Sequence, residues 1–228
     1  MRILRCLVRL LALISIQAML FGCGSSNDTV APNVGKTRKL LVGDSWTYDV
    51  SGQSQSGSFS GTSILNITQD TLAGVSVLAA TSTVSGVLNG SNTSSTSVTY
   101  MQQDATTGDL LLYGLKDTNT NNVAVTVTDR PLPIMWPGNW EAGKTINATA
   151  HYSNGTTESI SYSIIGQESV ATPTGAVTAW KLIISVSSNA IMSTGTFWFS
   201  PEIGNYIKMD VTNSAGSSST ILRSTTVK

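Results

Sequence analysis

The feature that most constrains the fold of this chain is a set of landmarks that recurs, in the same order, about 100 residues later. The landmarks are Gly43 and Gly143, then Gly74-Val-Ser-Val and Gly175-Ala-Val-Thr, then Gly108-Asp-Leu-Leu-Leu-Tyr and Gly204-Asn-Tyr-Ile-Lys-Met. Their offsets are 100, 101 and 96 residues. Near-constant offsets between ordered landmarks indicate an internal duplication. We expect a first repeat over residues 40–130, a connecting loop over 131–140 and a second repeat over 141–228.

Each repeat predicts six strands, because runs rich in β-branched and aromatic residues alternate with turn residues. No stretch has a convincing apolar period of 3.6 residues. In the first repeat the predicted strands are Ser45–Val50, Gly57–Gln69, Val75–Ser85, Ser95–Gln103, Asp109–Leu115 and Val123–Asp129. In the second they are Thr145–Tyr152, Thr157–Gln167, Val177–Ser187, Thr194–Phe199, Asn205–Thr212 and Ser219–Val227.

Alternation within these strands predicts which side chains share a face. Val123, Val125 and Val127 form one such set. Ile160, Tyr162 and Ile164 form another, as do Trp180, Leu182, Ile184 and Val186. The sequence therefore predicts an all-β fold made of two similar six-strand antiparallel meanders. A curved sheet, a barrel and a sandwich are all open as the way in which the meanders join, since each protects strand edges.

The N-terminus has the pattern of an export signal over residues 1–22. Three arginines precede an apolar run from Leu10 to Phe21, which is shorter than the ~20 residues that a spanning helix needs. Leu20-Phe21-Gly22-Cys23 resembles the lipobox of bacterial lipoproteins. The resemblance implies cleavage before Cys23, acylation of its thiol and anchoring to a membrane. Because Gly24 rather than Asp follows, it also implies the outer membrane, facing periplasm or cell surface, if the host has one.

Removal of the signal changes the charge and the cysteine count. The remaining 206 residues carry 10 Lys and Arg against 13 Asp and Glu, a net charge of −3. This balance argues against a nucleic-acid partner. Cys6 leaves with the signal and Cys23 is committed to lipid, so stability must come from a core rather than a disulfide. Residues 23–39 are polar without apolar periodicity, and we expect a flexible tether there.

The connecting loop contains the spelling of a phosphate-binding loop in Gly138-Asn-Trp-Glu-Ala-Gly-Lys-Thr145. Such a loop needs a buried strand before it and a helix after it. Here three prolines precede it, and strand-favouring residues follow Thr145. We therefore interpret the motif as a turn that enters a strand, and expect no nucleotide.

Three segments resemble exported bacterial proteins of unknown function: Gly43-Asp-Ser-Trp-Thr-Tyr48, Pro173-Thr-Gly-Ala-Val-Thr-Ala-Trp-Lys181 and Thr196-Phe-Trp-Phe-Ser-Pro-Glu-Ile-Gly-Asn-Tyr-Ile-Lys208. The resemblance covers most of the chain after the signal. It implies a β fold and brings no assigned activity.

Chemistry-bearing residues are sparse. His151 is the single histidine, and no nucleophile elbow or His–carboxylate spacing accompanies it. One histidine and no free cysteine disfavour a metal site, and the carboxylates are scattered through turns. We therefore expect no catalytic residue, no metal and no cofactor, and regard a hydrolase as a distant third hypothesis.

Two non-enzymatic hypotheses come first. One is an envelope lipoprotein whose curved sheet binds an apolar or amphipathic ligand. The other is a structural or interaction protein that meets glycan or another envelope protein through Trp136 and Trp140. Against the second stands the tendency of tryptophan to be buried, here in the junction between repeats. An open apolar cleft of several hundred Å³ would favour the first hypothesis, and exposed rings over a filled interior the second.

Overall fold

The structure is a computed structural model that describes residues 35–55, 57–118, 122–188 and 191–228. Residues 1–22 and Cys23 lie outside the described residues. The described part contains fifteen strands and no helix. The strands are β1 (Gly35–Lys36), β2 (Ser45–Ser54), β3 (Gly57–Leu72), β4 (Val75–Leu88), β5 (Ser91–Gln103), β6 (Leu110–Asp117), β7 (Ala124–Thr126), β8 (Ile134–Trp136), β9 (Asn139–Trp140), β10 (Thr145–His151), β11 (Thr157–Thr172), β12 (Gly175–Ser188), β13 (Ile191–Ser200), β14 (Asn205–Asn213) and β15 (Gly216–Thr226). Across these ranges there is no helix that could span a bilayer.

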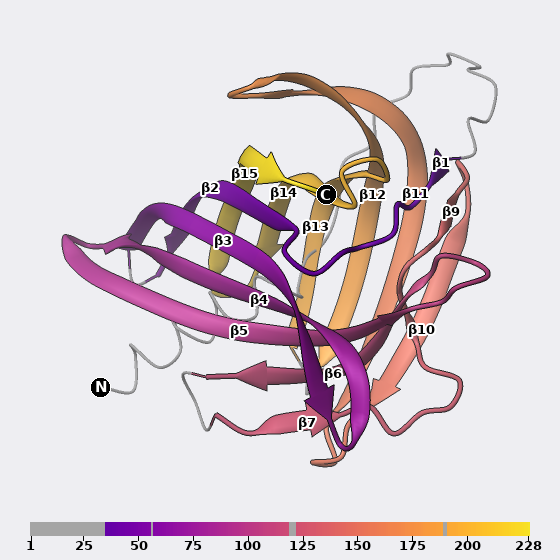
Figure 1. The fold of residues 1–228 in the computed structure, drawn as a ribbon. Coiled ribbons are helices and arrows are strands. Elements are labelled where there is room, and N and C mark those ends of the chain that lie inside the picture. Colours follow the sequence, from indigo (N-terminus) through magenta and orange to yellow (C-terminus); the bar gives the residue numbers. More distant parts are fainter. Residues whose placement is uncertain (1–34, 56, 119–121, 189–190) are drawn as a thin grey trace.

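Thirteen of the strands form one antiparallel sheet that is not closed. The first meander runs from β2 to β7 and the second from β10 to β15, each with sequential strands as neighbours. Pairing of β15 with β2 joins them, for example with Thr220 opposite Val50. In Figure 1 the sheet curls, so that β3 to β5 cross in front of β12 to β14. The predicted all-β fold of two six-strand meanders is thus confirmed, and of the three ways of joining them that the sequence left open, the structure fits a curved sheet or a sandwich.

The core lies between the inner faces of the two meanders, and alternation selects its residues. Ile160, Tyr162 and Ile164 of β11 are buried, as are Leu182, Ile184 and Val186 of β12, as predicted. The predicted set of Val123, Val125 and Val127 holds for two members, since Val125 packs against the cluster that contains Val127, and fails for Val123. Val127 is buried, but Val123 precedes β7 and is exposed, because the sheet pairs only three residues of this segment.

The two edges of the sheet meet at one point. Val127 and Tyr152 form a single antiparallel bridge next to the ends of β7 and β10. The backbone N–H of Thr128 donates to His151 (2.8 Å), and that of Ser153 donates to Thr126 (2.8 Å). We call these residues, with Asp129, the seam. The seam covers part of both edge strands without a continuous ladder of hydrogen bonds. It thereby reduces the length of unpaired edge that could pair with another chain.

The meanders repeat each other in backbone detail. The N–H of Gly43 donates to the carbonyl of Ile67 (2.8 Å), and the N–H of Gly143 donates to that of Ile164 (2.8 Å). Both glycines have positive φ, 94° and 80°, which favours glycine there. The strands β3 and β11 have 16 residues each, and β4 and β12 have 14 each. This repeated geometry supports the duplication proposed from the sequence.

Residues before the predicted boundary at Leu40 already take part in the fold. Strand β1 pairs with β9, and Thr37 donates from its backbone N–H to Gly138 (2.9 Å) and from its hydroxyl to Pro137 (2.8 Å). The tether predicted over 23–39 is therefore wrong for residues 35–38, and its residues 23–34 lie outside the described residues. The sequence did not indicate this pairing, because backbone hydrogen bonds of so short a segment leave no apolar period. The connecting loop 131–140 holds β8 and β9. Thr145 opens β10, so the phosphate-loop spelling leads into a strand.

Candidate functional site: an inner cavity and an outer groove

The two tryptophans of the connecting loop have different surroundings. Trp140 has 0% of its surface exposed and stacks on Phe199, with ring centroids 4.6 Å apart and an interplanar angle of 17°. Its Nε1 donates to the hydroxyl of Thr37 at 2.8 Å. Trp140 is therefore a core residue. It cannot stack on a glycan, which corrects the predicted use of Trp136 and Trp140 as a pair.

Trp136 is half-buried on β8, at the boundary between core and cavity. Its ring lies 5.2 Å from Phe199, 5.7 Å from Tyr162 and 6.3 Å from Phe197, measured between centroids. These tilted arrangements are favourable for aromatic pairs. The cluster brings one predicted site residue against side chains of β11 and β13, from the second meander.

An apolar cavity of about 80 Å³ lies next to Trp136, between the inner faces of both meanders. No charged side chain lines it. Its walls are Leu40, Leu65, Ile67, Ala80, Ser82, Thr99, Met101, Leu110, Leu112, Met135, Trp136, Ile160, Tyr162, Ile184, Phe197, Gly204, Asn205 and Tyr206. Burial raises the pKa of the Tyr162 and Tyr206 phenols above their ordinary range, so both stay neutral. The cavity suits an uncharged apolar group.

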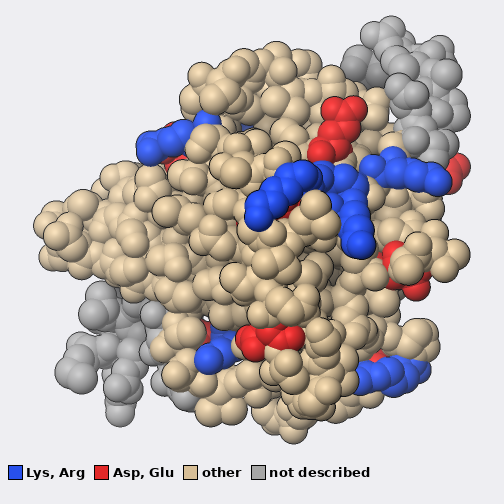
Figure 2. All heavy atoms as spheres, in the orientation of Figure 1, with Lys and Arg blue, Asp and Glu red and all other residues tan. Residues whose placement is uncertain are grey.

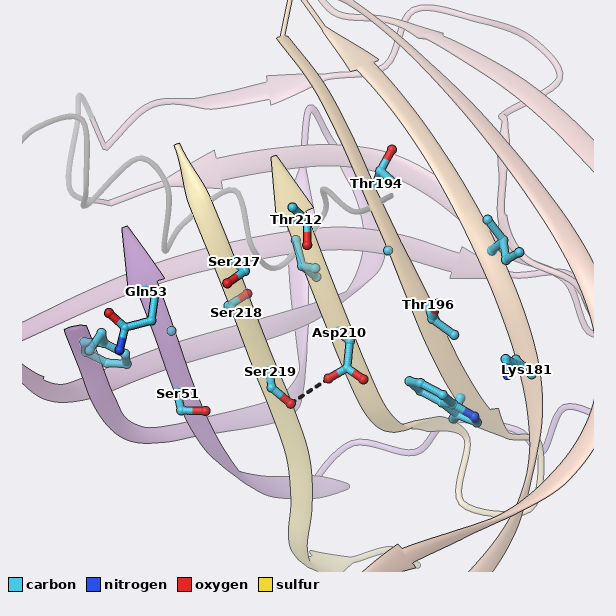
Figure 3. A pocket seen from close by; sticks show the side chains of 16 residues that line it. Ser51, Gln53, Lys181, Thr194, Thr196, Asp210, Thr212, Ser217, Ser218 and Ser219 are labelled. Atoms are coloured by element: carbon cyan, nitrogen blue, oxygen red, sulfur yellow. Dashed lines mark hydrogen bonds between the residues drawn. The ribbon is translucent and has the colours of Figure 1, made fainter. Parts of the chain in front are cut away.

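A larger concavity of about 670 Å³ lies over β2, β12, β13, β14 and β15 (Figure 3). We call it the outer groove, because most of its side chains lie on the face opposite the core. Two rows of directly paired residues cross it. One row is Thr196, Asp210, Ser219 and Ser51. The other row is Thr194, Thr212, Ser217 and Gln53.

Charged groups at one end of the outer groove pair with each other. Lys208 Nζ lies 2.6 Å from Asp210 Oδ2, and the Ser219 hydroxyl donates to Asp210 Oδ1 at 2.6 Å. Lys181 Nζ lies 3.3 Å from Glu168, which also accepts a hydrogen bond from Trp198 Nε1. Both ammonium groups lie over the Trp198 ring, at 4.6 Å for Lys208 and 5.7 Å for Lys181. Two cations and two anions thus balance.

Three other titratable side chains, those of His151, Asp129 and Glu158, make hydrogen bonds within the fold. His151 Nδ1 lies 2.7 Å from Asp129 at the seam. The hydrogen bonds from the His151 backbone and ring lower the pKa of the Asp129 carboxyl. Glu158 is 4% exposed and accepts a hydrogen bond from the Tyr152 hydroxyl at 2.8 Å. Its burial raises its pKa, an effect that this hydrogen bond offsets in part. In the described ranges no three His, Cys, Asp or Glu side chains gather as metal ligands.

Figure 2 shows that uncharged residues cover most of one face of the molecule. The period-two hydroxyls of the outer groove, such as Thr194 with Thr196 and Ser217 with Ser219, are visible in the sequence. They resemble ordinary solvated strand faces, and only the strand order assembles them into rows. Cys23, the predicted lipidation site, lies outside the described residues.

Comparison with known proteins gives a remote likeness of fold. No protein-family model matches the chain, and a search of curated proteins finds no match. Among solved structures, the chain is similar to a protein from Bacteroides fragilis that is inferred to be exported and has a YmcC-like fold. Identity is 12%, coverage is 84% of this chain and 99% of that chain, and the TM-score is 0.42.

A second similar structure is a protein from Parabacteroides distasonis that is inferred to be a lipoprotein. Identity is 10%, coverage is 85% of this chain and 100% of that chain, and the TM-score is 0.40. At these values neither likeness bears on the activity of this chain.

Proposed function

We propose that this protein is a cell-envelope lipoprotein, anchored through Cys23, and that it acts as a non-enzymatic binding module for an apolar or amphipathic ligand. The observation that carries the ligand class is the inner cavity. Its lining has no charge, and apolar side chains from both meanders supply most of it. Transfer of apolar ligand surface from water to such a lining is favourable in free energy.

The size of the cavity requires that a wall moves. A volume of about 80 Å³ is smaller than the ~150 Å³ of a cavity that binds benzene. Drug-sized ligands occupy ~300–1,000 Å³. A ligand with a longer apolar part therefore enters by displacing a segment of the wall.

Among the strands that line the cavity, β8 has the fewest residues paired to a neighbouring strand. It has three residues and pairs with β6 at two positions only, Leu110 with Trp136 and Leu111 with Ile134, with a register shift between them. Met135 and Trp136 both line the cavity and are half-buried. Segments with few ladder bonds open at low free energy. We assign β8 as the entry to the cavity.

Titration with N-phenyl-1-naphthylamine, an apolar fluorophore, tests the ligand class. The test variant is Ala80→Leu, which fills the cavity from its β4 wall. The control is Ala171→Leu, on an exposed position of β11. Overpacking costs ~1–3 kcal/mol, so we expect Ala80→Leu to weaken binding about tenfold while Ala171→Leu leaves it unchanged. Equal binding by both variants would show that the probe binds elsewhere, and would refute the inner cavity as the binding site.

The anchor has its own test. We expect Cys23→Ser to release the protein from membranes or to leave it as unprocessed precursor, because no segment other than the signal is apolar enough to hold the chain in a membrane. The measurement is membrane fractionation with mass spectrometry of the N-terminus. Normal retention of a cleaved Cys23→Ser protein would contradict lipidation.

A further inference from the structure

The outer groove has the chemistry of a second binding site. Its volume of about 670 Å³ falls in the range of small-molecule sites, and it lies on the face opposite the inner cavity. Its two rows present hydroxyl, amide and carboxylate groups, so donors and acceptors are both available along the four strands β13, β14, β15 and β2. This is a different surface from Trp136 and Trp140.

Three hydroxyls of the rows are available to a ligand, whereas the Ser219 hydroxyl donates to Asp210. Thr194 is 9% exposed, so it lies within the groove rather than on its rim. None of the hydroxyls of Thr194, Thr196 and Thr212 bonds to another residue in the described ranges. Adjacent strands lie ~4.8 Å apart, so paired residues repeat along each row at a regular spacing. A ligand with closely spaced hydroxyls can bond several strands at once.

The charge of the outer groove selects among such ligands. Lys208 pairs with Asp210, and Lys181 pairs with Glu168. Because each cation has an anion beside it, the groove has no surplus charge to attract an ionic ligand. A strongly acidic or basic ligand would meet a like charge of one of these pairs.

From these observations we propose that the outer groove binds an uncharged saccharide. The two hydroxyl rows supply hydrogen bonds to sugar hydroxyls, and Ile183 supplies an apolar contact at the β12 side. Trp198 is a positioning residue, since its ring lies under both lysines and holds them near their acidic partners. A saccharide fits because it is uncharged, like the groove as a whole, and carries many hydroxyl groups that can bond to the two rows.

An array of neutral and anionic oligosaccharides, probed with the full chain in detergent, tests this proposal. The test variant is Thr196→Val with Thr212→Val, which removes one hydroxyl from each row and keeps the β-branched shape. The control is Thr47→Val, on the outward face of β2 beyond the groove. Loss of two hydrogen bonds should weaken binding about tenfold in the double variant and less than twofold in the control.

Three results would overturn the proposal. They are no retention of any neutral oligosaccharide on the array, stronger retention of anionic than of neutral oligosaccharides, and equal retention by the double variant and wild type. Thermal melts of each variant show whether it folds. If the double variant unfolds, Ser217→Tyr blocks the second row by size instead, and unchanged retention in that folded variant is equally decisive.

Discussion

Asp44 is the most deeply buried charged side chain in the described ranges, with 0% of its surface exposed. Its carboxylate accepts hydrogen bonds from Arg38 Nη1 (2.7 Å), from the backbone N–H of Leu41 (2.8 Å) and from that of Lys228 (3.0 Å). Burial opposes ionisation, but these bonds together hold the Asp44 pKa below its ordinary value. One side chain thus connects the entry of the first meander to the end of β15.

We expect Asp44→Asn to lower the free energy of unfolding by about 3 kcal/mol, because it leaves a part-buried Arg38 without its partner. Asp49→Asn is the matched control, since Asp49 pairs with Arg223 at the surface. Exposed pairs contribute little, so the control should change stability by less than about 0.5 kcal/mol. Urea unfolding of both variants measures the difference. Equal effects would contradict the role of Asp44.

The pKa of Glu158 is shifted upward, in the opposite direction to that of Asp44. Burial raises its pKa in the folded state above the ordinary value of 4.5, so folding favours its protonated form. Its contribution to stability is fully present below pH 4.5 and is lost as pH rises through the folded pKa. Glu158→Gln mimics the protonated form and can still accept the hydrogen bond of Tyr152. We expect the stability gained by the variant over wild type to grow as pH rises from 4.5 through the folded pKa, measured by urea unfolding. A constant difference over that range would contradict burial as the cause.

At the scale of elements, sequence periodicity predicts the long strands well. Strands β3, β4, β11 and β12 have 14 or 16 residues, and in β11 and β12 alternation predicts the buried face. The short strands β1, β8 and β9 have two or three residues, which is too few for any period. The different burial of Trp136 and Trp140 could not be predicted for that reason, since only the pairing of β8 and β9 decides which ring reaches the core.

We expect the strands next to the seam to open locally, without unfolding of the whole protein. Asp129 accepts the backbone N–H of His151 at 2.6 Å and lies 2.7 Å from its ring. We expect Asp129→Ala to increase hydrogen exchange in β7 and β10 at least severalfold and to leave β12 and β13 unchanged, because core strands exchange by global unfolding. Asp70→Ala, at the exposed end of β3, is the control and should not affect the seam. Unchanged exchange in the Asp129→Ala seam would show that the bridge of Val127 and Tyr152 suffices.

At the scale of the whole molecule, the twelve strands of the two meanders were predictable and the closure of the sheet was not. Pairing of β15 with β2 brings together residues such as Leu222 and Tyr48, and no local pattern encodes that neighbour. Whether a twelve-strand path becomes a barrel or stops at a seam depends on accumulated twist. The inner cavity and the outer groove both arise from this arrangement. Their residues are therefore scattered through the sequence, and motif reasoning alone did not assemble them.

Native mass spectrometry of the full chain, purified from the envelope of its own host, tests the central claim that the inner cavity holds an apolar ligand. We expect wild type and Ala171→Leu to carry a non-covalent lipid-sized adduct that denaturation removes. Ala80→Leu should lack the adduct, because the added side chain occupies the cavity between the meanders. Wild type without any adduct, or an Ala80→Leu protein that keeps it, would contradict the account.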